Sequence, residues 1–259
     1  MQRSQRLRTI AKAVASGRRT VLELVQLTGA SAITIRRDLT DLADLGAIRR
    51  VRGGAEPLVQ RGAYYPFSLR LDDHGPQKTA IAQAAAAMIH PGDSILLDNG
   101  TTSIAVAHCL SGTGVTAMAL SLHVATAMAE KAGDEIIVPG GPVDHDDLAF
   151  VSAGAVDTVK GMRYDVALIS ACAADPATGL SVRRWGDARV KQAGLANANR
   201  VALLVTADKF ARTAAHVFAR ISDVDTVITT SDTPPDVAKE IELNGPDVLF
   251  ADVPQPGSE

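Results

Sequence analysis

Two stretches of the sequence carry residue types suited to holding negatively charged groups. The first, GASAITIRRDL at 29–39, places two adjacent arginines on what its pattern predicts is the start of a helix. The second, DNGTTS at 98–103, follows the apolar run SILL and precedes another predicted helix. Arginines on a helix can contact the phosphates and base edges of DNA, and a hydroxyl-rich loop at a helix N-terminus can bind a phosphate.

The first stretch lies in a predicted helix with one apolar and one polar face. Ser31 is suited to its N-cap, and Gly46 stands where a left-handed residue would end it. At about 100° per residue, Ile35, Leu39 and Leu42 share one face and must be buried. The opposite face offers a methyl, hydroxyls and guanidinium groups, which suit thymine methyls, phosphates and guanine edges. We expect DNA contacts from Ser31, Ile33, Thr34, Arg36, Arg37 and Thr40.

The residues around this helix predict a winged helix-turn-helix. An amphipathic helix is expected over 4–15, and the capping-box pattern at 20–23 begins a second helix that stops at Gly29. After the third helix, AIRRVRGG predicts a short strand and turn, the wing, that would track a neighbouring groove or the DNA backbone. The wing arginines expected to do so are Arg49, Arg50 and Arg52.

Charge is distributed unevenly along the chain. Residues 1–62 hold 12 Lys and Arg against 5 Asp and Glu, a net +7, whereas the rest hold 14 against 24, a net −10. A basic N-terminal segment on an acidic body indicates a polyanion-binding module. The alternative is that the adjacent arginines only neutralise Asp38 and Asp41 on a solvated helix face.

From residue 78 onward the sequence alternates between helical and strand patterns. Apolar strands such as SILLD, TAMAL, DVALIS, VALLV and TVITT are separated in several places by predicted helices. Strands rich in Val, Ile and Leu in this order predict an α/β domain with a mainly parallel sheet covered on both faces. Ligands of such sheets bind at the carboxyl ends of the strands, where the stretch 98–103 is expected to lie.

The stretch 98–103 combines three features of a phosphate site. Gly100 allows a tight turn, 101–103 supply hydroxyls, and the helix start contributes free N–H groups and the positive end of its dipole. The alternative is an ordinary helix start that binds nothing. Cys109 and Cys172 lie in no ligand spacing, and the acidic run 144–147 is read as a solvated turn. We therefore predict no metal and no cofactor.

Both halves of the chain resemble one known family. The segment SAITIRRDLTDLADLGAIRRVRGGAE resembles the signature of the DeoR family of bacterial transcription factors, and the motifs KTAIAQ, DNGTTS, PGG (139–141), YDVALIS and VTADKF are similar to its effector domain. That domain is itself similar to ribose-5-phosphate isomerase, so the resemblance implies a sugar-phosphate site. With the loop 98–103, which its own residues also favour, the resemblance implies these effector-binding residues: Lys78, Asp98, Gly100, Thr101, Thr102, Ser103, Ser121, Gly140, Gly141 and Lys209.

The sequence also departs from these relatives. The isomerases keep carboxylates after the third strand and on the next helix, and here those places read ISACA (169–173) and ARVKQ (188–192). Without a carboxylate base the pocket would bind a sugar phosphate but not isomerise it, so we predict no enzyme and no catalytic residue. The Thr-Asn-Ser segment usual in the regulators reads Ala-Leu-Ser at 119–121, so the identity of the effector cannot be borrowed.

The sequence therefore predicts a winged helix-turn-helix domain over 1–57, a linker over 58–77 and an effector-sensing and oligomerisation domain over 78–259. We expect a cytoplasmic homo-oligomer, a dimer or tetramer, that binds double-stranded operator DNA and a phosphorylated sugar or sugar alcohol and represses genes of carbohydrate or polyol catabolism. No apolar run reaches the ~18–20 residues of a membrane span. The alternatives are a sugar-phosphate isomerase-like enzyme with an accessory DNA-binding head, and a DNA-binding protein with a vestigial pocket.

Overall fold

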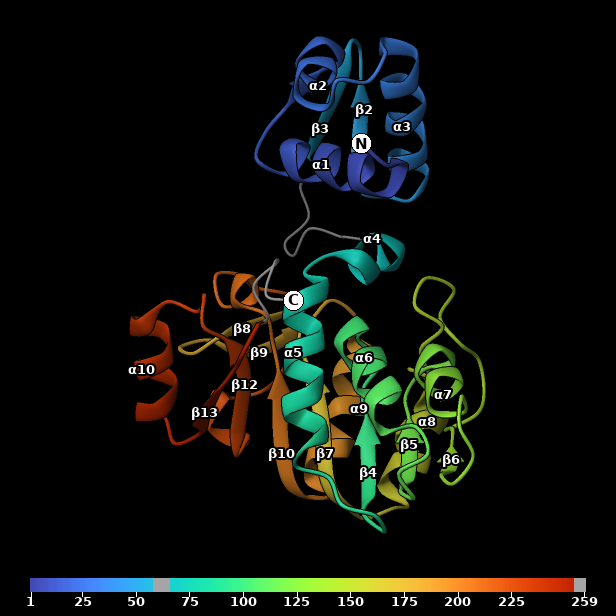
Figure 1. The fold of residues 1–259 in the computed structure, drawn as a ribbon, viewed down its shortest axis with the longest axis vertical. Coiled ribbons are helices and arrows are strands. Elements are labelled where there is room, and N and C mark those ends of the chain that lie inside the picture. The colour runs from blue at the N-terminus through green and yellow to red at the C-terminus, as the bar shows by residue number, and fades with distance from the viewer. Residues whose placement is uncertain (58–65, 254–259) are drawn as a thin grey trace, which may run out of the picture. The chain divides into compact units, whose positions relative to one another are not determined.

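The computed structural model describes residues 1–57 and 66–253, which form two compact units divided between Asp73 and His74 (Figure 1). The elements of the first unit are α1 (Arg3–Ala15), β1 (Arg19–Thr20), α2 (Val21–Thr28), α3 (Ala32–Asp44), β2 (Ile48–Val51), β3 (Gly54–Pro57) and α4 (Phe67–Asp72). Those of the second unit are α5 (Gly75–Ala86), β4 (Ser94–Leu97), α6 (Thr101–Leu110), β5 (Thr116–Ala119), α7 (Leu122–Met128), β6 (Glu135–Ile137), α8 (Ala153–Lys160), β7 (Tyr164–Ser170), β8 (Ala173–Asp175), β9 (Gly179–Val182), α9 (Trp185–Ala196), β10 (Ala198–Leu204), the 3₁₀ helices η1 (Ala207–Lys209) and η2 (Ile221–Asp223), β11 (His216–Ala219), β12 (Thr226–Thr230), α10 (Pro235–Leu243) and β13 (Asp247–Ala251).

The first unit is the expected winged helix-turn-helix. Thr20 and Glu23 form the capping box that starts α2, and Gly29 ends this helix with φ 71°, in the left-handed region. The hairpin of β2 and β3 forms the wing, and its strands join β1 in the order β1-β3-β2. The core of the unit is closed by apolar side chains from all three helices and the wing: Leu7, Ile10, Val14, Leu24, Ile35, Leu39, Leu42 and Ile48.

The segment expected as a linker, 58–77, contains regular structure in its described part. Helix α4 occupies most of 66–73, and Leu69 from this helix is buried in the core of the first unit. Helix α5 already begins at Gly75, three residues before the expected start of the second domain. The sequence did not indicate these helical residues because the six-residue α4 is too short to show helical periodicity. Tyr64 and Tyr65, expected in the linker, lie outside the described residues.

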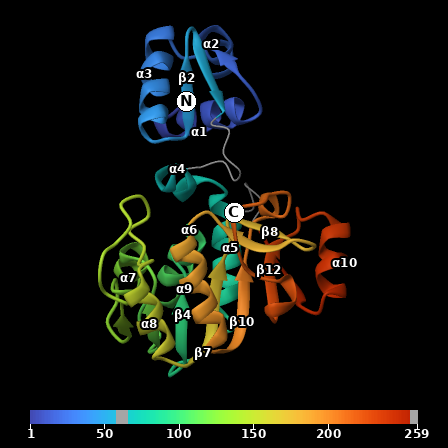
Figure 2. The same ribbon diagram turned by 180° about the vertical axis from the view of Figure 1, so that it is seen from behind.

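The second unit is built on a seven-stranded sheet in the order β13-β12-β10-β7-β4-β5-β6. All of its strand pairs are parallel, which confirms the predicted α/β architecture. Helices α5, α6 and α7 cover one face, and α8 and α9 cover the other (Figures 1 and 2). The carboxyl ends of the strands therefore lie along one edge, because parallel strands run in one direction.

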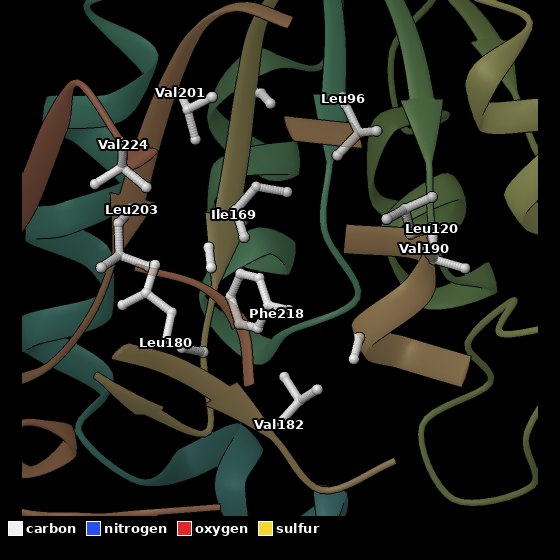
Figure 3. Close-up of a cluster of buried hydrophobic side chains, with 14 of the residues drawn as sticks. Leu96, Leu120, Ile169, Leu180, Val182, Val190, Val201, Leu203, Phe218 and Val224 are labelled. Carbon is white, nitrogen blue, oxygen red and sulfur yellow. The ribbon is translucent and has the colours of Figure 1, made fainter. Parts of the chain in front are cut away.

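Two apolar clusters lie on the two faces of this sheet. Along β4, Ile95 and Leu97 point into the cluster beneath α5 and α6, while Leu96 points into the cluster beneath α9. Figure 3 shows the second cluster, where Leu96 and Ile169 of the sheet lie in one group with Val190 of α9. A small antiparallel sheet, β11-β9-β8, which the sequence did not predict, contributes its apolar side chains to the same cluster.

In the described ranges, none of the helices has both the length and the apolar character needed to span a bilayer.

Candidate functional site

Helix α3 presents one apolar and one polar face, as its periodicity predicts. Ser31 is the N-cap, and its Oγ accepts a hydrogen bond from the backbone N–H of Thr34 at 3.2 Å. Ile35, Leu39 and Leu42 are buried, whereas Ile33 is 78% exposed. An isoleucine left in solvent on the first turn of a helix contributes nothing to the core, so its side chain is available to a partner.

The acidic side chains of α3 are neutralised from another helix. Arg6 of α1 donates from Nε to Asp38 Oδ2 at 2.6 Å, and Arg3 donates to Asp41 Oδ2 at 2.8 Å. The bond to Asp38 raises the pKa of Arg6. The alternative pairing of these aspartates with the adjacent arginines of α3 is therefore not formed. In the described part of the chain no ion pair engages Arg36 or Arg37, and both are exposed.

The wing arginines differ in their surroundings. Arg50 Nη1 donates to Thr40 Oγ1 at 2.8 Å and so ties the wing to α3. Arg49 forms an ion pair with Glu56 on the neighbouring strand, and Arg52 is exposed at the hairpin turn. A hollow of about 320 Å³ opens on the same unit, lined by Arg3, Arg6, Ile33, Thr34, Arg37 and Asp38. This hollow connects α1 to the exposed face of α3, where Arg37 has no ion-pair partner among the described residues.

In the second unit, the loop after β4 leads directly into α6. Gly100 is the N-cap residue of α6, and a Cβ added there would lie 2.4 Å from Ser170 Oγ, so this position requires glycine. Thr101, Thr102 and Ser103 form the first turn of α6 and are buried. Within the described residues, the fully buried Ser103 Oγ has no hydrogen-bond partner. A buried hydroxyl without a partner at a helix N-terminus is a ready donor to an anion.

Asp98 faces the interior of the unit. Its carboxylate accepts hydrogen bonds from the backbone N–H and the hydroxyl of Ser170, at 2.8 and 2.5 Å, and it forms an ion pair with Lys191. Burial by itself would raise the pKa of Asp98, but the Lys191 ammonium and the hydrogen bonds from Ser170 hold this pKa below the ordinary value of an aspartate. Asp98 was expected to contact an effector directly. Its side chain is fully buried and engaged, so it holds the loop in place, and its direct contact with an effector stays a prediction.

A second buried carboxylate adjoins this ion pair. Asp187, in the first turn of α9, accepts a hydrogen bond from Asn99 Nδ2 at 3.0 Å and lies 3.7 Å from Lys191 Nζ. Burial raises its pKa, and the Lys191 charge offsets this in part while Asp98 adds to the increase. Asp187 immediately precedes 188–192, the segment in which the sequence suggested no carboxylate. The segment 188–192 itself holds no carboxylate, as expected, but Asp187 places one directly before it, on the first turn of the helix.

The start of α9 is held by the acidic run 144–147. Arg184, its N-cap residue, forms ion pairs with Asp144 and Asp147, the latter at 2.6 Å. Burial lowers the pKa of Arg184, but the two carboxylates outweigh this effect and raise it. The run was read as a solvated turn, whereas Asp147 is buried and orients α9. In the described residues no group of three or more His, Cys, Asp and Glu side chains is arranged to hold a metal ion.

The remaining expected residues are spread along the edge of the sheet. Lys78 is buried in the first turn of α5, and Lys209 ends η1 after β10. These two segments meet where His74 Nε2 lies 3.7 Å from Asp208 Oδ1. Ser121 is fully buried and caps α7 by accepting from Val124 N–H at 3.2 Å. Gly140 and Gly141 follow the edge strand β6, two strands from β4, with φ of 78° and 80°.

The sequence analysis missed four residues of this arrangement: Asn99, Ser170, Asp187 and Lys191. One signal was available for the last two. Asp187 and Lys191 stand four residues apart on α9, so they share the helix face that carries buried Ala188 and Val190 neighbours. A charged pair within an otherwise apolar pattern indicates a buried site, but nothing local to α9 names Asp98 as its partner.

Comparisons with known proteins match both units. A family model described as "DeoR C terminal sensor domain" matches residues 73–231, and one described as "DeoR-like helix-turn-helix domain" matches residues 6–61. The chain is 28% identical to the putative aga operon transcriptional repressor of Escherichia coli O157:H7, over 89% of this chain and 87% of that protein. It is 29% identical to the HTH-type transcriptional repressor GlcR of Bacillus subtilis strain 168, over 81% of each. The HTH-type transcriptional regulator UlaR of Shigella flexneri is 25% identical over 89% of this chain and 91% of its own.

Two solved structures superpose on parts of this chain. Ribose 5-phosphate isomerase A from Methanocaldococcus jannaschii superposes on 51% of this chain and 52% of its own, with a TM-score of 0.37 and 16% identity. The eIF2B beta protein of Chaetomium thermophilum superposes on 58% of this chain and 47% of its own, with a TM-score of 0.42 and 17% identity.

Proposed function

Because the chain belongs to the DeoR family of transcriptional regulators, we propose that it is a repressor whose affinity for DNA is changed by a phosphorylated sugar or sugar alcohol. The first unit binds operator DNA through α3 and the wing. The second unit binds the effector at the carboxyl edge of its sheet and does not turn it over. Two of its relatives are named as repressors, which supports a repressing role. Such a regulator would act in the cytoplasm, because bacterial DNA lies there.

The observation that carries the DNA proposal is the ion pairing of α1 with α3. Because Arg6 and Arg3 neutralise Asp38 and Asp41, the outward face of α3 has an uncompensated positive charge. An arginine there can donate two hydrogen bonds to guanine in the major groove, and exposed Ile33 can contact a thymine methyl. The expected contacts are those of Ser31, Ile33, Thr34, Arg36, Arg37 and Thr40, with Arg49, Arg50 and Arg52 on the backbone or in the adjacent groove.

The effector proposal rests on the loop between β4 and α6. The α6 N-terminus, the hydroxyls of 101–103 and the unpartnered Ser103 Oγ together suit a phosphate group. Lys78 and Lys209 lie on segments that meet at the same sheet edge, and we propose that they contribute positive charge to the site. Ser121, Gly140 and Gly141 would line its far side.

We further propose a two-fold oligomer. One winged helix reads a half-site too short for useful specificity, so a pair of copies on a repeated site is the simplest arrangement. The effector would act by binding the DNA-competent and DNA-incompetent arrangements with different affinity, with a coupling of about 1–3 kcal/mol.

The DNA proposal is tested by selecting bound fragments from bacterial genomic DNA and measuring affinity for the recovered site by fluorescence anisotropy. Arg37→Ala should weaken binding to that site by about 5- to 150-fold, as expected for loss of a base contact, and should relax its sequence preference. The matched control is Arg200→Ala, which removes an exposed arginine from β10. Unchanged affinity and sequence preference in Arg37→Ala would refute docking through α3.

The effector proposal is tested by thermal shift of the full chain against sugar and polyol phosphates, each beside its unphosphorylated parent. A phosphate that raises Tm should lose this effect in Ser103→Ala, whose unliganded stability should be unchanged because the hydroxyl has no partner to lose. The control Thr126→Ala removes an exposed hydroxyl from α7 and should retain the shift. If no phosphorylated compound raises Tm while DNA binding is intact, the effector proposal fails and the DNA proposal stands.

A second candidate function is sugar-phosphate isomerisation, which one observation favours. Asp187 is a buried carboxylate of raised pKa beside the proposed phosphate loop, and raised pKa values suit a general base. Incubating the full chain with ribose 5-phosphate and following ribulose 5-phosphate formation separates the two candidates. Turnover that is lost in Asp187→Asn would establish the enzyme, and its absence at high protein concentration favours the sensor.

A further inference from the structure

Asp187 is a buried carboxylate without a cation of its own, because Lys191 lies closer to Asp98. It stands on the first turn of α9, is 6% exposed, and has apolar neighbours in Ala188 and Val190 on the same helix. The other charged groups of this region have complementary partners: Asp98 with Lys191, and Arg184 with Asp144 and Asp147. Two carboxylates thus share one buried ammonium, which leaves a net negative charge in the interior of the unit.

The contacts of Asp187 involve only one of its two carboxylate oxygens. Asn99 Nδ2 donates to Oδ1 at 3.0 Å, and Lys191 Nζ lies 3.7 Å from the same oxygen. In the described ranges no hydrogen bond or ion pair reaches Oδ2. Oδ2 is not among the sealed, unpartnered polar atoms of the described residues, so it is an acceptor that the protein's own donors leave free and that a group arriving from outside the chain can reach.

Asp187 is connected to the proposed phosphate loop through Asn99. Asn99, which holds Oδ1, directly precedes Gly100, the N-cap residue of α6. Asp187 is therefore one hydrogen bond from the segment that carries the unpartnered Ser103 hydroxyl. A ligand whose phosphate lies on the first turn of α6 would extend its carbon chain along the same edge of the sheet, where α9 begins.

We propose that Asp187 Oδ2 accepts a hydrogen bond from a hydroxyl group of the effector and thereby selects polyhydroxylated phosphates. The inference rests on the proposed effector site. An ionised carboxylate accepts hydrogen bonds but donates none, so at this point it favours the hydroxyl of a sugar or sugar alcohol phosphate over inorganic phosphate, which has no carbon-bound hydroxyl to offer. It also disfavours a ligand with a second phosphate or a carboxylate at this point, because the two negative charges would repel.

The alternative is that Asp187 only orients Asn99. An asparagine at 187 separates the two roles, because its Oδ1 can still accept from Asn99 while its Nδ2 replaces the accepting oxygen by a donor. The Asp187→Asn substitution also removes a negative charge that the nearby Asp98 carboxylate repels. A purely structural Asp187 would therefore tolerate the change with no effect on ligand choice.

The test is isothermal titration calorimetry of the full chain with the sugar or polyol phosphate that gives the largest thermal shift and with inorganic phosphate. Asp187→Asn should weaken binding of the sugar phosphate by about 10²-fold or more, because the asparagine would present a donor to the ligand's hydroxyl where the carboxylate presents an acceptor. Binding of inorganic phosphate should be retained or strengthened. The matched control, Asp157→Asn on α8, removes an exposed carboxylate and should change neither.

The outcomes separate this inference from the function on which it rests. If the wild-type protein binds the sugar phosphate and Asp187→Asn binds it equally well, the role of Asp187 is overturned while the sensor stands. If Asp187→Asn loses both ligands equally, the residue only shapes the loop, and the inference again fails. A wild-type protein that binds neither ligand refutes the effector site itself. Should Asp187→Asn not fold, Asp187→Ser carries the same comparison.

Discussion

Arg6 of α1 holds Asp38 of α3 through a hydrogen bond of 2.6 Å between Nε and Oδ2, and the Asp38 side chain is almost completely buried. The bond joins the first helix of the DNA-binding unit to the helix proposed to enter the groove. It also keeps a carboxylate of α3 away from the adjacent Arg37. The same contact therefore stabilises the unit and leaves the exposed face of α3 positively charged.

Arg6→Ala should destabilise the first unit by about 2–4 kcal/mol, because it leaves the buried carboxylate of Asp38 without its partner. The Tm of this unit, followed by calorimetry of the full chain, measures the loss. The double variant Arg6→Ala/Asp38→Ala should be less destabilised than the single one, because the orphaned charge is gone. Equal stability of the single and double variants would show that the pair contributes nothing specific.

Lys191→Met should destabilise the second unit by about 3–5 kcal/mol, since it leaves Asp98 and Asp187 as two buried carboxylates without a cation. Adding Asp98→Asn to this variant should restore part of the loss. Chemical unfolding monitored by circular dichroism gives both values. The ion pair would prove dispensable if Lys191→Met unfolded at the wild-type denaturant concentration.

Asp187→Asn should raise the stability of the unliganded protein at neutral pH, by an amount that depends on pH. The folded state raises the pKa of Asp187, so it binds this proton more tightly than the unfolded chain does. That contribution is fully present below the ordinary Asp pKa and is lost as pH rises through the raised value. The Tm difference between variant and wild type should therefore widen with rising pH above about 4 and then level off.

The groups facing Asp187 in this experiment are Lys191 and Arg184 of α9 and Asp98 after β4. Their own titrations occur in both proteins and largely cancel in the difference. A Tm difference that is constant from acidic to neutral pH would contradict a raised pKa for Asp187.

Gly100→Ala should lower stability by about 1–3 kcal/mol, the usual cost of forcing extra atoms into a packed site. The new Cβ would lie 2.4 Å from Ser170 Oγ, which is engaged by Asp98. Ser170→Ala alone should cost less than Gly100→Ala, and the double variant should show coupling between the two positions. Strictly additive Tm changes would mean that the two residues do not share the site.

The salt dependence of DNA binding should distinguish the free arginines from the paired one. Arg36→Ala, Arg37→Ala and Arg52→Ala each remove a positive charge that displaces counterions from the DNA, so each should reduce the slope of log K against log salt by up to about 1. Arg49→Ala should reduce it less, because Glu56 already neutralises Arg49 in the free protein. Titrations at several salt concentrations, with binding followed by anisotropy, provide the slopes. Equal slopes for all four variants would show that the Glu56 pair opens on binding.

The architecture was predictable where local patterns and burial agree. The capping box at Thr20, the turn at Gly29 and the face of Ile35 and Leu39 are written in adjacent residues, and the structure confirms each. The alternation of apolar strands with helices predicted the parallel sheet. No pattern predicted helix α4 or the small sheet β11-β9-β8, because these elements are too short to show a helical or strand periodicity.

The candidate site was predictable only in its local part. The loop 98–103 and its glycine could be found because a strand, a turn and a helix start are consecutive in sequence. The partners of Asp98 could not, since Ser170 and Lys191 lie 72 and 93 residues away and meet it only when β7 and α9 are in place. Asp187 was not predicted because it stands one residue before 188–192, the segment that corresponds to the isomerase helix.

The division of the sheet into two apolar clusters has a consequence for how such regulators diversify. Alternate residues of β4 serve opposite clusters, while the loop that follows it, Asp98 to Gly100, belongs to neither. Changes in the loops at the strand ends can therefore alter which metabolite is recognised without repacking either side of the sheet. A design that alters the recognised metabolite would therefore keep Gly100 and Gly186 and vary the residues beside them, at 99, 101–103, 185 and 187.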